Sequence, residues 1–176
     1  MDVPRIGPRE VVYENSYQQV YRVHADFGAF SKEYYVTDYG WRTGLIVVRG
    51  ESILLVQQYR LLIDGPSWEI PGGRVDRGET PEVSAVRECL EETGVRCKNL
   101  TPLITFHPGL DTLHNPTRIF LTHDFSTTDR EPQPKEVERH EWVPLSRCLD
   151  MINGAEMVDS LSILGLLTYH SVWSRR

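Results

Sequence analysis

The sequence predicts an α/β or α+β fold, a sandwich of helices around a mixed β-sheet, and three observations support this prediction. The first third of the chain is rich in tyrosine and valine, which favour strands. Two short, dense apolar runs follow at residues 45–48 and 53–56. Helical segments then alternate with further strands in the remainder of the 176 residues. Strands mixed with helices in a chain of this length are typical of layered α/β or α+β domains.

Composition limits the classes of protein that the chain can belong to. Hydrophobic residues make up 40% and charged residues 25%, a globular mixture that excludes a disordered or collagen-like chain. The net charge of −6 disfavours nucleic acid as a partner, since phosphate backbones attract basic proteins. No apolar stretch is long enough to cross a bilayer, and the N-terminus has no signal-like apolar core. We therefore expect no membrane partner.

The cysteines indicate a reducing compartment. The chain has three, Cys89, Cys97 and Cys148, an odd number without a CxxC pair or zinc-finger spacing. A disulfide framework or a structural zinc site is therefore disfavoured. We expect reduced thiols and a cytoplasmic location.

The strands are predicted in chain order from composition and turn signals. Residues 17–24 and 33–37 are predicted to be half-buried strands because they are rich in tyrosine and valine. The apolar runs at 45–48 and 53–56 are strands covered on both faces, separated by the turn-like sequence Arg-Gly-Glu-Ser. Further strands are expected at 101–106, at 118–122 and near Trp142.

The helices are predicted from their end signals and apolar spacing. Thr80 is a suitable N-cap, Pro81 suits the first helical position, and Gly94 suits the left-handed position after a helix that ends near Thr93. A short helix is expected at about 146–153 and a longer one at about 159–173.

The helix at 81–93 carries a group of acids. On a helical wheel, one arc that we expect to face the core contains Val83, Val86, Cys89, Leu90 and Thr93. Glu88, Glu91 and Glu92 lie on the opposite side, with Glu88 and Glu92 one turn apart. Like charges at this spacing destabilise a helix unless something offsets them. A solvated surface does so, and so does Mg²⁺, which binds carboxylates while leaving positions for phosphates.

The residues before this helix favour the metal interpretation over the solvated surface. Pro71-Gly72-Gly73 and Gly78 allow the backbone to approach a ligand closely. Arg87 is placed to pair with Glu79 and so to fix the loop to the helix. A flexible backbone, an ion pair and a carboxylate cluster are the components of a metal–phosphate site.

The stretch from Gly73 to Val95 resembles the signature of the Nudix hydrolases, Gx5Ex7REUxEExGU, where U is an apolar aliphatic residue. Every fixed position matches, and Cys89 occupies one U position as a small buried hydrophobe. Walker-type and GxGxxG phosphate loops are absent from the sequence. The resemblance implies a Nudix-type α/β/α sandwich, here with an N-terminal antiparallel β extension at 1–42 before a hydrolase domain at 43–176.

The flanking residues are similar to those of the ADP-ribose pyrophosphatase branch. The branch has a strand ending in Gln-Tyr-Arg, here residues 58–60, and a Glu-Ile-Pro-Gly-Gly turn, here residues 69–73. It also has a proline after the signature, here Pro108. The resemblance implies substrate contacts from Arg60, Trp68, Glu69 and Pro108.

The resemblance also implies the roles of the acids. Glu88 and Glu92 would be the main ligands of Mg²⁺, with Mn²⁺ as an alternative, and the Gly72 carbonyl a backbone ligand. Glu91 would be a third ligand or the base that activates water, and Glu79 and Arg87 would hold the geometry. A further catalytic glutamate is expected between residues 132 and 141; Glu136 is preferred by its spacing to Trp142, with Glu138 and Glu141 as alternatives.

The implied activity is Mg²⁺-dependent hydrolysis of the pyrophosphate bond of nucleoside diphosphate sugars, with ADP-ribose favoured and AMP and ribose 5-phosphate as products. The alternatives are a Nudix hydrolase for GDP-mannose or a dinucleotide, and a sensor that binds a nucleotide without cleaving it. The acidic helix as a protein-binding surface is a third alternative. By resemblance, the N-terminal β extension mediates a homodimer.

Overall fold

The computed structural model describes residues 3–128 and 137–172. The chain forms two compact units. The first unit consists of residues 1–41 and 106–116, and the second of residues 42–105 and 117–176. The segment 106–116 therefore belongs with the N-terminal strands although it lies far from them in sequence.

The first unit is a five-stranded sheet with the order β1-β3-β4-β11, in which β2 also pairs with β3. Its strands are β1 (Arg5–Ile6), β2 (Glu10–Glu14), β3 (Gln19–Asp26), β4 (Ser31–Asp38) and β11 (Leu113–His114). The two strands predicted here are confirmed as β3 and β4, which pair antiparallel over their whole length. Alternate residues of β3 (Tyr21, Val23 and Ala25) are buried, which explains why the sequence there alternates.

The second unit is built on a seven-stranded mixed sheet with the order β10-β12-β5-β6-β14. Its strands are β5 (Arg42–Arg49), β6 (Ser52–Arg60), β10 (Thr101–Phe106), β12 (Thr117–Thr122) and β14 (Val137–Pro144), with β7 (Gly65–Glu69) on β6 and β8 (Gly72–Arg74) on β5. β12 runs parallel to β5 and the other pairs of this sheet that join β5 or β6 are antiparallel. A two-stranded ribbon pairs β9 (Val95–Lys98) with β13 (Asp124–Thr127).

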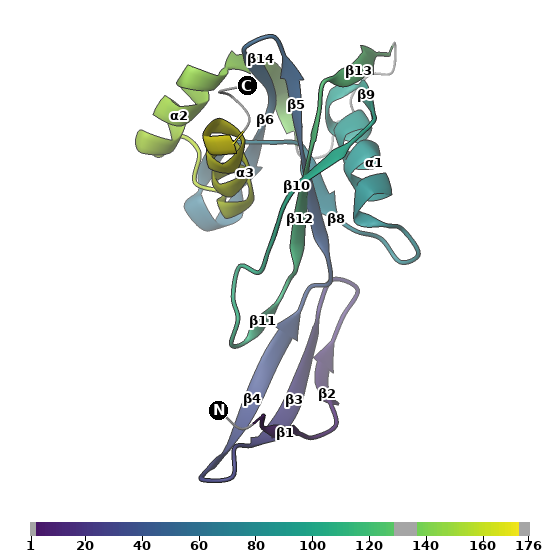
Figure 1. Cartoon of the computed structure of the whole chain (residues 1–176), viewed down its shortest axis with the longest axis vertical. Helices are drawn as coiled ribbons and strands as arrows, with labels where there is room; N and C mark the ends of the chain where they lie inside the picture. The colour runs from purple at the N-terminus through teal and green to yellow at the C-terminus, as the bar shows by residue number, and fades with distance from the viewer. Residues whose placement is uncertain (1–2, 129–136, 173–176) are drawn as a thin grey trace. The chain divides into compact units, whose positions relative to one another are not determined.

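Helices cover both faces of this sheet, α1 (Pro81–Thr93) on one side and α2 (Leu145–Asn153) with α3 (Ser160–Val172) on the other (Figure 1). A cluster that includes Leu45, Val47 and Leu54 of the sheet packs against Ala85 and Cys89 of α1. On the opposite face the absence of a side chain at Gly44 lets Leu161 of α3 approach the strand. The α/β/α sandwich predicted from the sequence is confirmed.

The ends of α1 are as predicted, and its buried face is as predicted at Cys89 and Thr93 but not at Val83. The Thr80 side chain accepts a hydrogen bond from the Val83 amide, and Gly94 closes the helix with a φ of 70°. Val83, expected in the core, is 55% exposed. Besides Cys89, the helix turns Ala85 to the sheet, because these small residues allow the two backbones to pack closely.

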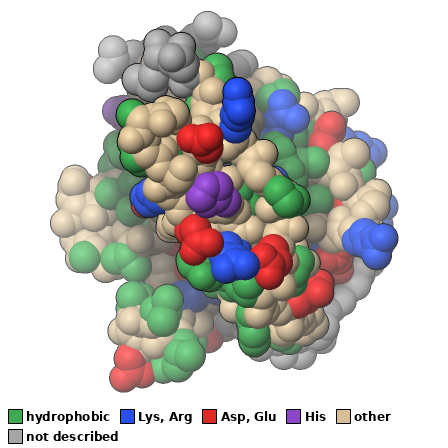
Figure 2. Space-filling model, turned by 90° about the horizontal axis from the view of Figure 1, so that it is seen from below, with side chains coloured by type: hydrophobic (Ala, Val, Ile, Leu, Met, Phe, Trp, Pro, Cys, Tyr) green, Lys and Arg blue, Asp and Glu red, His purple; other side chains and the backbone are tan. Residues whose placement is uncertain are grey.

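Charges of both signs are mixed on the face drawn in Figure 2, where acidic and basic side chains lie next to one another around a histidine. Neither sign therefore dominates that face. In residues 3–128 and 137–172, no helix has the length and apolar character needed to cross a membrane.

Candidate active site

The acids of α1 are brought against the glycine turn that precedes it. The Glu88 carboxylate lies so close to Gly73 that a Cβ placed there would be 2.5 Å from Glu88 Oε1. One turn further along the helix, Glu92 Oε2 accepts a hydrogen bond of 3.0 Å from the Gly72 amide. Glu92 Oε1 accepts another, of 3.1 Å, from the buried Gln58 side chain of β6. A side chain at position 73 would therefore displace the Glu88 carboxylate from the turn.

Arg87 is the centre of the charge network around these acids. Its guanidinium donates to both oxygens of Glu79 at 3.0 Å, which fixes the preceding loop to the helix. It also donates to Glu88 at 3.0 Å and to Glu91 at 3.3 Å. The bidentate geometry with Glu79 suits the planar fork of arginine and not the point charge of lysine. The pairing of Arg87 with Glu79, predicted from the sequence, is present.

Burial and charge shift the pKa values of these groups in opposite directions. Burial raises the pKa of Glu92 from 4.5 to about 8; the Gly72 hydrogen bond opposes this shift, and the nearby charge of Glu88 adds to it. Burial also raises the pKa of Glu88, against the attraction of Arg87. The hydrogen bond from Arg87 lowers the pKa of Glu79. The acids nearest the glycine turn are therefore the ones that favour a proton or another cation.

The donor set of this region fits a hard divalent cation. Glu88, Glu91 and Glu92 offer carboxylate oxygens, the ligands that Mg²⁺ takes in proteins. Glu88 and Glu92 are held beside a backbone turn that has no side chains to block access. In the described ranges, no three His, Cys, Asp or Glu side chains are arranged as a metal-ligand group. Hydrogen bonds from protein donors satisfy these carboxylates instead: Gln58 and the Gly72 amide donate to Glu92, and Arg87 donates to Glu88.

A cavity of about 320 Å³ lies beside Arg60 and Glu69. Arg60 donates two hydrogen bonds to Glu69, from Nε at 2.8 Å and from Nη2 at 2.5 Å. The charges of both residues act on Glu92, so this ion pair lies near the acidic end of α1. The cavity is lined by Arg42, Arg60, Leu61, Leu62, Ile63, Ser67, Glu69, Val158 and Asp159.

The other residues predicted for the site are placed less closely. Trp68 is 6% exposed, and the Arg139 guanidinium lies 5.0 Å from its ring centre. Pro108 belongs to the first unit. Glu136 lies outside the described residues. Glu141 of β14 is exposed and forms an ion pair with Arg139 at 3.1 Å, and Glu138 is exposed.

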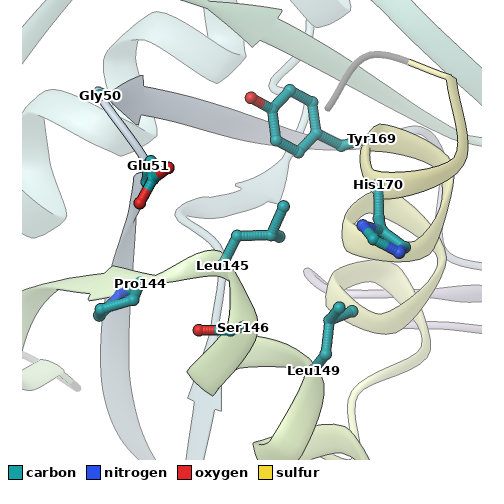
Figure 3. A pocket seen from close by; sticks show the side chains of 8 residues that line it. All are labelled: Gly50, Glu51, Pro144, Leu145, Ser146, Leu149, Tyr169 and His170. Atoms are coloured by element: carbon teal, nitrogen blue, oxygen red, sulfur yellow. The ribbon is translucent and has the colours of Figure 1, made fainter. Parts of the chain in front are cut away.

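A larger cavity of about 400 Å³ lies elsewhere in the second unit, between the β5–β6 turn, the start of α2 and the end of α3 (Figure 3). Its lining residues are Gly50, Glu51, Pro144, Leu145, Ser146, Leu149, Tyr169 and His170. It contains one carboxylate, that of Glu51, and no residue predicted for the site. This cavity therefore offers fewer carboxylates than the acidic helix does.

Three residues at the acidic helix and its cavity were not anticipated from the sequence. They are Gln58, whose amide donates to Glu92, and Arg42 and Ser67, which line the cavity. Gln58 lies within the Gln-Tyr-Arg run, so its polar type in an otherwise apolar strand was a usable signal. Arg42 and Ser67 carried no such signal, because each lies in a sequence segment without a motif.

The fold and the site together define the class: an α/β/α sandwich in which a glycine turn meets a helix rich in carboxylates. Residues 38–159 match the NUDIX domain. The chain belongs to the Nudix hydrolase family, as the signature predicted.

Relatives with named activities cover most of the chain. It is 34% identical over 125 residues to a CMP-5'-(N-acetyl-N-hydroxy-3-aminopropyl)phosphonate hydrolase of Streptomyces rubellomurinus, covering 70% of this chain and 61% of that protein. It is 30% identical over 135 residues to the ADP-ribose pyrophosphatase of Bacillus subtilis, covering 76% and 73%. The crystal structure of an ADP compounds hydrolase superimposes with a TM-score of 0.82 at 16% identity, covering 97% of this chain and 94% of that one. This last likeness confirms the fold.

Proposed function

We propose that the protein hydrolyses the pyrophosphate bond of nucleoside diphosphate sugars in a Mg²⁺-dependent reaction, with ADP-ribose as the favoured substrate. One observation carries the proposal: the carboxylates of Glu88 and Glu92 lie against the Gly72–Gly73 turn, and the charges of Arg60 and Glu69, which line a cavity, act on Glu92. The similarity to the Bacillus subtilis ADP-ribose pyrophosphatase supports this choice of substrate.

Glu88 and Glu92 would hold the Mg²⁺, for which Mn²⁺ is an alternative, together with the carbonyl of Gly72. When bound, the cation would neutralise the pyrophosphate and lower the pKa of a water molecule, the nucleophile of the reaction. Glu91, which contacts Arg87 at 3.3 Å, would be a further ligand or the base that takes the water proton. For ADP-ribose, the water oxygen bonds to one phosphorus, the bridging P–O bond breaks, and AMP and ribose 5-phosphate leave.

The remaining residues would orient the reactants. Arg87 fixes Glu79, and through it the loop, so that the glycine turn keeps its position beside the acids. The Arg60–Glu69 pair borders the cavity next to Glu92, where the substrate would extend from the metal. Trp68 is buried beneath Arg139, which favours a supporting role in packing over direct stacking on the substrate.

A second candidate substrate is a nucleoside monophosphate joined to a phosphonate, favoured by the relative from Streptomyces rubellomurinus. The phosphorus–oxygen–phosphorus bridge is the same, so the residues that cleave it would be unchanged. GDP-mannose and dinucleotides share that bridge too. A sensor without activity is disfavoured because Glu88, Glu91 and Glu92 are all present.

We also propose that the protein is a cytoplasmic homodimer formed through the first unit. Several apolar side chains of that unit are exposed, among them Val11, Tyr13, Phe30 and Tyr35. Exposed apolar surface of this kind is typical of an interface. All three cysteines are free and buried, in agreement with a reducing compartment. Light scattering at several protein concentrations tests the dimer, which a constant monomer mass would refute.

A panel assay tests the activity and the metal together. Purified protein is incubated with ADP-ribose, GDP-mannose, a dinucleotide and a CMP-linked phosphonate, with Mg²⁺, with Mn²⁺ or with a chelator, and the products are identified by ³¹P NMR. We expect metal-dependent cleavage, fastest for ADP-ribose. Glu92→Gln should lower kcat by roughly two to four orders of magnitude, the range typical for lost catalytic groups. Glu82→Gln, in the exposed first turn of α1, is the matched control and should leave kcat unchanged.

The metal assignment also has a readout that does not depend on activity. Mg²⁺ should raise the melting temperature of the wild-type protein, because a ligand that binds only the folded state stabilises it. The Glu92→Gln variant should show little of this effect. A variant that keeps near-normal rates on every substrate, or that gains as much stability from Mg²⁺ as the wild type, would refute the assignment.

A further inference from the structure

Arg42 provides a positive charge in the cavity that contains Arg60 and Glu69. It is the first residue of β5, is half-buried, and lines the 320 Å³ cavity together with Arg60 and Glu69. Among the described residues, none forms an ion pair or a hydrogen bond with its side chain. A half-buried guanidinium has five donors to satisfy, so such a position favours an anionic ligand.

The other charged groups of the cavity are already paired or hydrogen-bonded. Arg60 and Glu69 form a two-point ion pair, which places the Arg60 donors on a protein carboxylate. Asp159 caps α3, and its Oδ2 accepts hydrogen bonds from the Ser162 amide at 2.9 Å and the Ser162 hydroxyl at 2.8 Å. Arg42 is therefore the cation of the cavity that is available to a ligand.

A second observation also points to a ligand in this cavity. The Ser67 hydroxyl lines it, is buried, and has no hydrogen-bond partner among the described residues. Buried hydroxyls are nearly always hydrogen-bonded, so an exception in a cavity indicates that a ligand, an ion or a water molecule takes this hydrogen bond. The rest of the lining is apolar, from Leu61, Leu62, Ile63 and Val158. The lining thus suits a molecule with one anionic group and one apolar face.

We propose that Arg42 binds a phosphate group of the substrate in this cavity, as a substrate-binding residue distinct from the Arg60–Glu69 pair. The proposal rests on the proposed function for the identity of the substrate, but the contact itself does not require that the bond be cleaved. The guanidinium fork would donate two hydrogen bonds to the phosphate oxygens. The apolar wall would cover the base or sugar attached to that phosphate.

The assignment changes the expected role of Arg60. The resemblance implied that Arg60 contacts the substrate, and that prediction remains untested. In the structure the Arg60 side chain donates to Glu69, which is 5% exposed. The negative charge of this buried carboxylate needs the positive charge of Arg60 beside it. Breaking this pair to bind a phosphate would leave Glu69 buried and uncompensated, which is costly. Arg42 can take a phosphate without any such loss.

Calorimetric titration of the metal-free protein tests the proposal directly. The probes are AMP and ribose 5-phosphate, which carry a phosphate on either product half, and adenosine, which carries none. Arg42→Gln should weaken binding of AMP, ribose 5-phosphate or both by about tenfold to a hundredfold, the value of charge-assisted hydrogen bonds. The affinity of Arg42→Lys for these probes should lie between those of the wild type and Arg42→Gln. The affinity for adenosine should be the same in all three proteins. The probe whose affinity falls in Arg42→Gln identifies the phosphate of the substrate that Arg42 binds.

Arg96→Gln is the matched control, since Arg96 is an exposed arginine of β9 and does not line the cavity. It should leave the affinities unchanged, and thermal unfolding verifies that each variant is folded. The proposal is overturned if the wild-type protein binds neither phosphate probe, or if Arg42→Gln binds both as the wild type does. Hydrolysis of ADP-ribose separates the two proposals. Arg42-dependent binding without cleavage refutes the proposed function alone, whereas cleavage with an unchanged KM in Arg42→Gln refutes the role of Arg42.

Discussion

Replacing Glu92 by glutamine should make the metal-free protein more stable although it removes the activity. Burial raises the pKa of this carboxyl from 4.5 to about 8 in the folded protein. At pH 7 the unfolded chain has lost the proton that the folded chain still holds. The resulting linkage destabilises the folded state by about 3 kcal/mol at pH 7, a penalty that glutamine does not have.

The sign of this effect depends on pH in a defined way. Because the folded pKa is the higher one, the contribution of Glu92 to stability is fully present below pH 4.5 and is lost as the pH rises to about 8. The advantage of Glu92→Gln should therefore be near zero at pH 4.5 and grow through neutral pH. Glutamine also keeps both hydrogen bonds, since its carbonyl accepts from the Gly72 amide and its amide donates to a flipped Gln58 side chain.

The assay is urea unfolding in the presence of a chelator, at several values of pH between 4.5 and 8. Glu82→Gln is the control from the same helix. Its charge lies in the first turn, where the helix dipole favours an acid, so the control should lose a few tenths of a kcal/mol. A Glu92→Gln protein that is less stable than the wild type at pH 7, or whose advantage is the same at pH 4.5, would refute the reasoning.

Three further predictions concern the surroundings of the site. Arg87→Ala should lower the free energy of unfolding by about 3 kcal/mol in urea titration, because it leaves Glu79 and its neighbours uncompensated; an unchanged value would contradict the network. Gly44→Ala should cost about 1–3 kcal/mol by the same measurement, since its Cβ would lie 2.6 Å from Leu161 Cδ2; wild-type stability would show that α3 moves away freely. Cys148 should resist iodoacetamide at pH 8 in the folded protein, because burial raises its pKa to about 12; rapid labelling would contradict this burial.

The sequence predicted best where local signals act over a few residues. Thr80 and Gly94 bound α1 because a capping hydroxyl and a left-handed glycine are requirements of the helix ends themselves. β7 and β8 were not predicted, although residues 66–81 were recognised as rich in glycine and proline. Their pairing with β6 and β5 depends on partners elsewhere in the chain, and Gly72–Arg74 has no strand-like composition.

Packing distance explains why the wheel for α1 was wrong in detail. The helical wheel assigns the buried face from the positions of hydrophobic side chains alone, and it therefore placed Val83 in the core. The sheet, however, also contacts Ala85 beside the predicted Cys89, because small side chains let the helix lie close enough for Ser84 Oγ to donate to the Arg74 carbonyl at 2.9 Å. Compared with the orientation that the wheel predicted, the helix is rotated toward Ala85. This orientation leaves Val83 exposed to solvent and partly buries Glu88 and Glu92.

That rotation connects the packing of α1 to its chemistry. Carboxylates on the outer face of a helix would remain hydrated, with ordinary pKa values and little tendency to gather a cation. Placed at the margin of the core, Glu88 and Glu92 lose part of their hydration, and the fold provides Arg87, the Gly72 amide and Gln58 as partial substitutes. These partners compensate the acids only in part, since the pKa values of both remain raised. The remaining unfavourable free energy is what a divalent cation would relieve on binding. The small residues that bring α1 close to the sheet are therefore as necessary to the proposed metal site as the carboxylates themselves.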